Sequence, residues 1–210
     1  MWRLAYKIST AILLVLLVIP PPILWAHQRN VVPRQAALYR ATVIREVRFY
    51  WGMAESPAMF MGQIAQESGF KEDAKSAFAS GLTQFTKPTA EWIQGLYARD
   101  LRELCAAKTG CPLEPKWAIR AMVLYDKRLW NGYPNACGDE RKAFMLSGYN
   151  GGDGWTRKER AQAIKLALDP DVWFGSVETV CLRAAWACKE NRDYPRRILL
   201  ELRHHYEDGR

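Results

Sequence analysis

A stretch of apolar residues at helical spacing, bounded by residues typical of helix ends, constrains the fold of this chain most. Ser56-Pro57 favours a helix start, because serine caps free backbone amides and proline suits the first helical position. Gly69 can end the helix in the left-handed conformation. Between them, apolar residues recur on one side at Met59, Phe60 and Ile64. The pattern predicts a helix that carries Glu67 in its last turn, on or beside the apolar face.

The position of Glu67 indicates an unusual carboxyl group. Burial disfavours the charged form and raises the pKa of a carboxyl, and the negative end of the helix dipole acts in the same direction. A carboxyl that stays protonated near neutral pH can serve as a general acid. The alternative is an ordinary solvated glutamate at the end of a helix.

Further helix signals follow along the chain, and they favour an all-α fold. Pro33 opens an amphipathic stretch to about Ala54, Pro88 and Pro115 stand at two later helix starts, and Asp139 can cap another helix. Helical patterns also occur over residues 158–168, 176–188 and 194–206. No alternating strand pattern of convincing length is present. We expect an N-terminal segment over 1–30, a linker and first helix over 31–55, and one helical domain over 56–206.

The N-terminal segment has the character of an export signal. Arg3 and Lys7 precede an uncharged run over residues 8–26, so the basic side should stay in the cytoplasm. Pro20-Pro21-Pro22 interrupts this run, which favours a cleaved signal peptide, whereas Leu24-Trp25-Ala26 is a poor cleavage site. We expect a retained signal anchor that tethers a periplasmic domain to the bacterial inner membrane, with removal of the segment as the alternative.

The cysteine content agrees with export to an oxidising compartment. The chain has five cysteines, at positions Cys105, Cys111, Cys137, Cys181 and Cys188. Cys105 with Cys111 and Cys181 with Cys188 are local pairings within reach, although Cys105 or Cys111 could also bridge to Cys137. An odd number leaves at least one thiol free or paired with another molecule.

Charge and histidine positions narrow the possible partners. The formal net charge of +8 favours anionic surroundings such as phospholipid head groups, cell-wall polymers or nucleic acid. Arg196-Arg197 and Arg203-His204-His205 are basic clusters, but an export signal separates the domain from DNA, so we expect no nucleic-acid partner. The histidines lie far from the cysteines in sequence and no Cys-x-x-Cys spacing occurs, so we expect no metal site and no cofactor.

Several motifs resemble those of lytic transglycosylases of the soluble type, lysozyme-like enzymes that cut peptidoglycan. The matching segments, in chain order, are Glu67-Ser68-Gly69-Phe70, Gly81-Leu82-Thr83-Gln84 with Pro88-Thr89-Ala90, and Ser147-Gly148-Tyr149-Asn150-Gly151-Gly152. Tyr194 corresponds to a tyrosine in a late helix of the family. The resemblance covers about Ser56 to Leu199 and implies a lysozyme-like helical domain of the goose-type or SLT kind.

Three positions depart from the family pattern. Thr83 stands where the family usually has methionine, Phe78 falls near a usual glycine, and Gly148 replaces a common alanine. These departures leave the acid in place and affect the shape of the sugar groove.

The resemblance implies a lyase reaction on the bond between N-acetylmuramic acid (MurNAc) and N-acetylglucosamine (GlcNAc). Most glycosidases use two carboxylates, and this sequence offers one convincing candidate. By resemblance, the N-acetyl group of the muramic sugar supplies the missing nucleophile. Glu67 first protonates the leaving oxygen and then acts as a base on the C6 hydroxyl, which closes a 1,6-anhydro ring.

The resemblance also implies substrate-binding roles for Ser68, Gln84, Tyr149, Asn150 and Tyr194. Ser68 would bind substrate or steady the carboxyl, and Gln84 would offer a donor and an acceptor to the N-acetyl group. Tyr149 would supply a ring wall and a hydroxyl, and Asn150 would hold a sugar substituent. Tyr194 would hydrogen-bond Glu67 and help to keep it protonated. The alternatives are local capping and loop closure, a helix-ending turn, and core packing of Tyr194.

Two other functions remain open at the level of sequence. A hydrolytic goose-type lysozyme would use a second acid, for which Asp73 and Asp153 are the candidates, although both lie in polar loops. A catalytically inactive peptidoglycan-binding subunit is the other alternative. For the active enzyme, the small size favours local opening of the wall for a conjugation, secretion or phage-type system, with an envelope-spanning complex as a possible partner.

Overall fold

The computed structural model describes residues 32–207, and the expected N-terminal segment lies outside them. No helix within this range has the length and apolarity needed to cross a bilayer. The described range is mostly helical, as predicted. Its elements are α1 (Arg34–Trp51), α2 (Ala58–Ser68), β1 (Ala79–Ser80), β2 (Phe85–Thr86), α3 (Lys87–Leu96), α4 (Ala98–Leu101), α5 (Pro115–Asn131), α6 (Gly138–Gly151), α7 (Asp153–Lys165), the 3-10 turn η1 (Val177–Thr179), α8 (Ala185–Leu200) and the 3-10 turn η2 (Leu202–His205).

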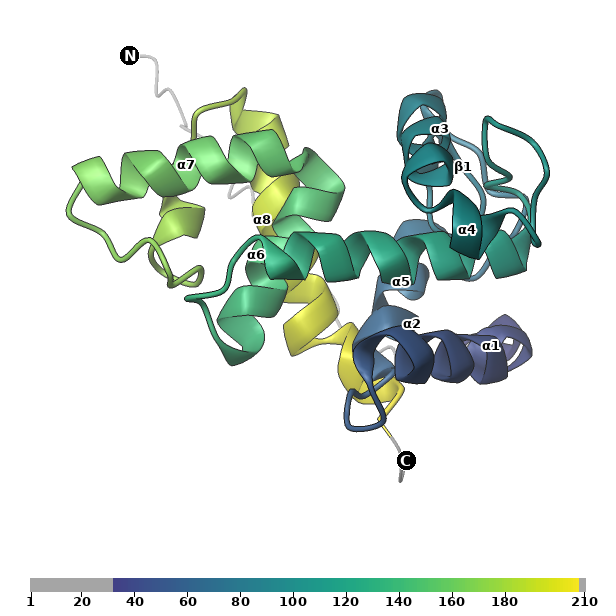
Figure 1. The fold of residues 1–210 in the computed structure, drawn as a ribbon. Helices are drawn as coiled ribbons and strands as arrows, with labels where there is room; N and C mark the ends of the chain where they lie inside the picture. The colour runs from purple at the N-terminus through teal and green to yellow at the C-terminus, as the bar shows by residue number, and fades with distance from the viewer. Residues whose placement is uncertain (1–31, 208–210) are drawn as a thin grey trace, which may run out of the picture. The chain divides into compact units, whose positions relative to one another are not determined.

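Helix α5 runs through the centre of residues 32–207 (Figure 1). It contacts α1 along one side, α3 and α4 near its beginning, and α6 at its end. Its core-facing side chains are fully or almost fully buried, as the periodicity predicts: Trp117, Ile119, Met122, Val123 and Leu129. Helices α2 and α8 contact each other, and α8 also packs against α6. This packing brings together α2 and α8, which are more than a hundred residues apart in the sequence.

The helix starts that carry proline are confirmed, for local reasons. The backbone N–H of Ala58 donates to Ser56 Oγ at 3.3 Å, directly before α2. At the start of α3, Thr86 Oγ1 accepts from the backbone N–H of Thr89 at 3.3 Å, with Pro88 in the first turn. Pro115 is the first residue of α5. Each proline lies where its missing N–H leaves no hydrogen bond unmade.

Other helix limits differ from the prediction. Helix α1 ends at Trp51, before a glycine, and not near Ala54. Helix α7 begins at Asp153, five residues earlier than expected, because Gly152 separates it from α6. Asp139 lies inside the first turn of α6 and does not cap it; its carboxylate instead accepts from Arg203 Nη1 at 2.7 Å.

The C-terminal helices were predicted wrongly. The expected helix over 176–188 consists of the three-residue turn η1 and the first residues of α8. Tyr194 was expected at a helix start, but α8 continues from Ala185 through Pro195 to Leu200. Tyr194, Ile198 and Leu199 are buried in the core around this proline. Packing of this face therefore maintains a helix that local propensity would interrupt.

The local cysteine pairings are confirmed. Disulfides join Cys105 to Cys111 and Cys181 to Cys188, and Cys137 is free and exposed. The first disulfide closes the loop between α4 and α5, and the second ties the loop after η1 to the first turn of α8.

Candidate active site

Glu67 lies at a cleft of about 800 Å³ that is lined by α2, the hairpin segment, α3, α5, α6 and α8. Helix α2 is buried over residues 58–64 and ends at Gly69, which has left-handed angles (φ 60°, ψ 31°), as predicted. This short apolar helix places the carboxyl of Glu67 in the cleft wall. Removal from water raises the pKa of Glu67 to about 8, and the negative charge of Glu190 adds to the increase. The carboxyl therefore has the protonation state that a general acid needs at neutral pH.

Tyr194 on α8 reaches the same carboxyl. Its hydroxyl donates a hydrogen bond to Glu67 Oε1, as the sequence predicts, and its side chain is otherwise buried. The predicted effect on protonation is wrong, however. A donor to a carboxylate stabilises the charged form, so this hydrogen bond lowers the pKa of Glu67 and opposes the larger effect of burial.

Gln84 lies in the turn of the β1–β2 hairpin and also faces the cleft. Its backbone has a left-handed φ of 47°, and its Nε2 donates to the carbonyls of Gly81 (2.8 Å) and Ala74 (3.2 Å). The amide N–H groups thus close the loop, and loop closure was the alternative to substrate binding for this residue. Gln84 Oε1 is the part of the amide that can accept a hydrogen bond from a ligand.

Gly81 permits the hairpin for two reasons. Its φ is 80°, and a Cβ at this position would lie 1.7 Å from the carbonyl oxygen of Pro112. Only glycine allows the loop that follows α4 to approach the hairpin this closely.

Tyr149 and Asn150, at the end of α6, form the adjoining wall of the cleft. The Tyr149 hydroxyl donates to the backbone carbonyl of Thr83 at 2.8 Å, and its ring lies 5.6 Å from that of Phe85. Asn150 Oδ1 accepts from Asn191 Nδ2 at 3.2 Å. Five of the six predicted site residues therefore line one cleft, drawn from α2, the hairpin, α6 and α8.

Residues 51–170, more than half of the chain, match the family described as Transglycosylase SLT domain. The chain belongs to this family. It is a lytic transglycosylase of the lysozyme-like type, a lyase that acts on peptidoglycan. No curated protein matches the chain. The matched range ends before α8, so the position of Tyr194 in the SLT site is known from the structure alone.

Ser68 is the one predicted site residue that this SLT domain does not bring into the cleft. Its hydroxyl donates to the carbonyl of Ile64, one turn earlier in α2, at 3.4 Å. It is not among the residues that line the cleft. Ser68 therefore makes a hydrogen bond within its own helix, which was the alternative to a role in substrate binding.

The two predicted candidates for a second acid also lie outside the cleft. Asp73 is exposed in the loop after α2. Asp153 accepts from the Tyr133 hydroxyl at 2.5 Å and from Arg157 Nε at 2.7 Å. It lines a separate hollow, which shares only Tyr125 of α5 with the cleft. The carboxylates that do face the cleft are Glu190 and Asp193 on α8, and Asp193 pairs with Lys189.

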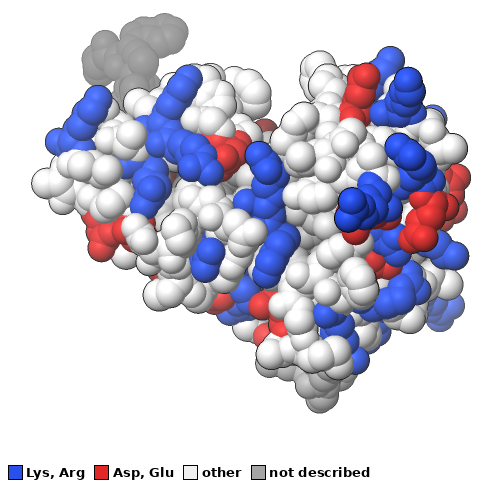
Figure 2. Space-filling model, viewed as in Figure 1, with Lys and Arg blue, Asp and Glu red and all other residues white. Residues whose placement is uncertain are grey.

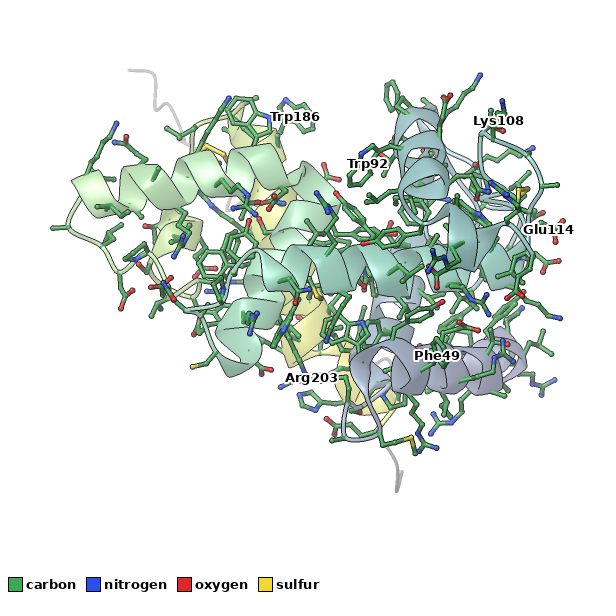
Figure 3. All side chains as sticks on the ribbon, in the orientation of Figure 1. Phe49, Trp92, Lys108, Glu114, Trp186 and Arg203 are labelled. Atoms are coloured by element: carbon green, nitrogen blue, oxygen red, sulfur yellow. A yellow bond between two sulfur atoms is a disulfide. The ribbon has the colours of Figure 1, made fainter. Side chains whose placement is uncertain are left out.

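Sequence reasoning missed most of the contribution of α8. One face of this helix lines the cleft with Trp186, Lys189, Glu190, Asp193 and Arg197 beside Tyr194. The spacing of three and four residues is the signal that could have found them. It was hidden because the segment was interpreted as two separate helices. Figure 3 shows Trp186 near the start of α8.

Asp126 is a further carboxyl that sequence reasoning missed. It lies on α5 with no exposed surface, and Gln63 Nε2 donates to its Oδ1 at 3.4 Å. Burial raises its pKa well above the usual range, and the charge of Glu67 contributes to the increase. Within residues 32–207, no group of three or more His, Cys, Asp or Glu side chains is arranged to hold a metal ion.

Proposed function

We propose that this lytic transglycosylase cleaves the β-1,4 bond between MurNAc and GlcNAc and releases 1,6-anhydro-MurNAc ends. The observation that carries the proposal is the carboxyl of Glu67, held in the cleft wall with a pKa of about 8. A protonated Glu67 can transfer its proton to the glycosidic oxygen as the bond to C1 breaks.

The second step uses the same residue as a base. After proton transfer Glu67 is a carboxylate, and the Tyr194 hydroxyl stabilises this charge by donating to Oε1. The carboxylate then removes the proton from the C6 hydroxyl of the muramic sugar, whose oxygen attacks C1 and closes the anhydro ring. The proton returns to Glu67, so the enzyme is regenerated without consuming water.

The other cleft residues have matching roles in substrate binding. Gln84 Oε1 can accept from the N–H of an N-acetyl group, since its Nε2 is used by the backbone. Tyr149 supplies a ring wall whose position is fixed by its hydrogen bond to Thr83. Asn150 is held by Asn191 and can contact a sugar substituent.

Hydrolysis is the second candidate, and Glu190 is the observation that favours it. Glu190 lines the cleft, and its charge acts on Glu67, so it could position a water molecule. Mass spectrometry of digested sacculi distinguishes the two reactions. Anhydro-muropeptides support the lyase reaction, whereas products with only reducing ends would establish hydrolysis instead.

The role of Glu67 is tested with Glu67→Gln, which keeps the shape and removes the proton. We expect a loss of about 10²–10⁴-fold in the rate of product release, as is typical when a general acid is removed. Glu91→Gln is the matched control, since Glu91 is exposed on α3 and lies outside the cleft. Full activity of Glu67→Gln would exclude Glu67 as the acid. A wild-type protein that binds sacculi without releasing products would instead support an inactive binding subunit.

The disulfides support a proposal about the cellular setting. Two disulfides suit an oxidising compartment on the outer side of the inner membrane. We propose that the N-terminal segment tethers the domain to that membrane and that the enzyme opens the wall locally for a conjugation, secretion or phage-type system. Deletion of the gene followed by a DNA-transfer assay tests the conjugation version, and unchanged transfer would count against it.

A further inference from the structure

A second hollow of about 730 Å³ adjoins the cleft of Glu67, and we call it the side hollow. It lies over the second half of α5, between α3 and the start of α7. Its principal side chains are Trp92, Tyr125, Lys127, Arg128, Asp153 and Arg157. Tyr125 lines both hollows, so a ligand that passes Tyr125 in the cleft meets the side hollow next.

The side hollow is positively charged, in contrast to the cleft. Three cations and one carboxylate line it, which leaves a net charge of +2. Figure 2 shows Lys and Arg side chains gathered along the depression between α7 and α3. In the cleft, the cations of α8 are balanced by Glu190 and Asp193. An anionic group on a ligand is therefore favoured in the side hollow and not beside Glu67.

The single carboxylate of the side hollow is already engaged. Asp153 accepts from the Tyr133 hydroxyl and from Arg157 Nε, at 2.5 and 2.7 Å. This hydrogen bond uses one edge of the Arg157 guanidinium and fixes its position. Gly132 makes room for it, because a Cβ at that position would lie 2.4 Å from Arg157 Nη2. The guanidinium is thus held at the rim, and its other N–H groups can bind a carboxylate.

The opposite wall offers a flat aromatic surface with a second guanidinium. Trp92 is 45% exposed, and its ring meets that of Tyr125 edge to face at 5.8 Å. The guanidinium of Arg128 lies 5.4 Å from the centre of the Trp92 ring, a geometry that holds the cation in place. Figure 3 shows Trp92 on α3, on the opposite side of the depression from Trp186. Two anchored guanidinium groups and a tryptophan face suit a ligand with carboxylates on an apolar chain.

We propose that the side hollow binds the acidic peptide stem of the glycan strand whose sugars lie in the cleft. Peptidoglycan carries short peptides on its muramic sugars, and these peptides contain free carboxylates. A stem attached to a sugar beyond Tyr125 reaches Arg128 and Arg157 without a break in the strand. This assignment rests on the proposed cleavage at Glu67, because it requires the strand to lie along that cleft.

The test compares two ligands in calorimetric titrations with full-length Glu67→Gln protein. One ligand is a soluble glycan strand with intact stems, and the other is the same strand after an amidase has removed them. We expect the strand with stems to bind about tenfold more tightly. Arg128→Gln combined with Arg157→Gln should abolish this preference and leave binding of the bare strand unchanged. Arg48→Gln, at an exposed position on α1, is the control and should keep the preference.

Three results would overturn the proposal: equal affinity for both ligands, a preference that survives in the double variant, or an equal loss of affinity for both ligands. Release of products by the wild-type enzyme is measured in parallel with both ligands. Failure to release products from either one contradicts the proposed cleavage, whereas the binding comparison still reports on the side hollow. The two ideas can therefore fail separately.

Discussion

At the scale of single residues, two opposing effects act on the carboxyl of Glu67. Removal from water raises its pKa, and the hydrogen bond from Tyr194 lowers it. In the proposed mechanism, the first effect favours the acid of the first step, and the second favours the carboxylate that would act as a base afterwards. A residue that must serve in both states benefits from a pKa near the working pH, and the value of about 8 agrees with this requirement.

Tyr194→Phe separates these two effects. Without the hydroxyl the carboxylate loses its donor, so the pKa of Glu67 rises further above 8. Because the acid form is active in the first step, the alkaline decline of kcat/KM should move to higher pH. The maximal rate should fall, since the base step loses a stabilising contact. The pH profiles of kcat/KM and of kcat on soluble strands measure the two changes.

Tyr39→Phe is the matched control, because Tyr39 also donates to a glutamate, Glu72, at 2.9 Å, but lies outside the cleft. Its pH profile should equal that of the wild type. An alkaline limb that moves to lower pH in Tyr194→Phe would show that Tyr194 keeps Glu67 protonated, contrary to the electrostatic argument.

The buried carboxyl of Asp126 should make the stability of the domain depend on pH. Asp126 Oδ2 and Gln63 Oε1 are buried without partners, and a proton on Oδ2 directed at Gln63 would pair both atoms. The raised pKa agrees with a neutral Asp126. The folded state then keeps a proton that the unfolded chain releases near pH 4, so this residue's stabilisation is complete below that pH and is lost as pH rises towards the folded pKa.

Asp126→Asn removes this pH dependence while keeping an amide that can pair with Gln63. Relative to the variant, the wild type should lose free energy of unfolding between pH 4 and pH 8. Urea unfolding at several pH values measures the difference. Asp73→Asn, at an exposed position, is the control and should unfold in parallel with the wild type. A constant difference between Asp126→Asn and the wild type across this range would contradict a neutral Asp126.

At the scale of elements, helix ends that depend on local chemistry were predictable and helices that depend on packing were not. Ser56 with Pro57, and Thr86 with Pro88, satisfy or avoid free backbone amides within a few residues, so their signals are visible in sequence. Pro195 gives the opposite signal, yet α8 continues through it because buried neighbours hold the helix. Burial against segments that are distant along the chain cannot be inferred from the local sequence.

The same distinction explains which of the predicted site residues lie together. Glu67, Gln84, Tyr149 and Asn150 belong to motifs with their own local structure, and the fold brings them to one cleft. Trp186 and its neighbours on α8 share one face only because α8 is a single continuous helix, so their common position is not apparent from two shorter helices. Ser68 belongs to a motif, but its hydroxyl turns back to its own helix.

Trp186→Ala tests the contribution of α8 to substrate binding. Trp186 lines the cleft and is 71% exposed, so its ring can cover a sugar without moving other side chains. We expect KM to rise about tenfold, or ~1.4 kcal/mol, with little change in kcat, because the contact is the same in the ground state and the transition state. Leu200→Ala is the control, since Leu200 is exposed at the end of the same helix and outside the cleft. A fall in kcat with unchanged KM would contradict a binding role.

At the scale of the whole molecule, the two disulfides hold the two sides of the cleft. Cys105–Cys111 closes the loop that brings Pro112 against Gly81, and so supports the hairpin of Gln84. Cys181–Cys188 ties the start of α8, the helix that carries Tyr194 and Trp186. The exposed thiol of Cys137 takes part in neither.

Loss of either disulfide should therefore lower stability, and each loss should affect its own side of the cleft. For such short loops, the constraint on the unfolded chain is about 2 kcal/mol per disulfide, so Tm should fall by several degrees in Cys105→Ser and in Cys181→Ser. Cys181→Ser should also weaken substrate binding, because Trp186 and Tyr194 lose the anchor of their helix. Cys137→Ser should leave Tm and activity unchanged. Thermal unfolding and KM, measured with and without dithiothreitol, check these expectations, and a wild-type Tm that does not respond to the reductant would show that the disulfides do not limit the stability of the domain.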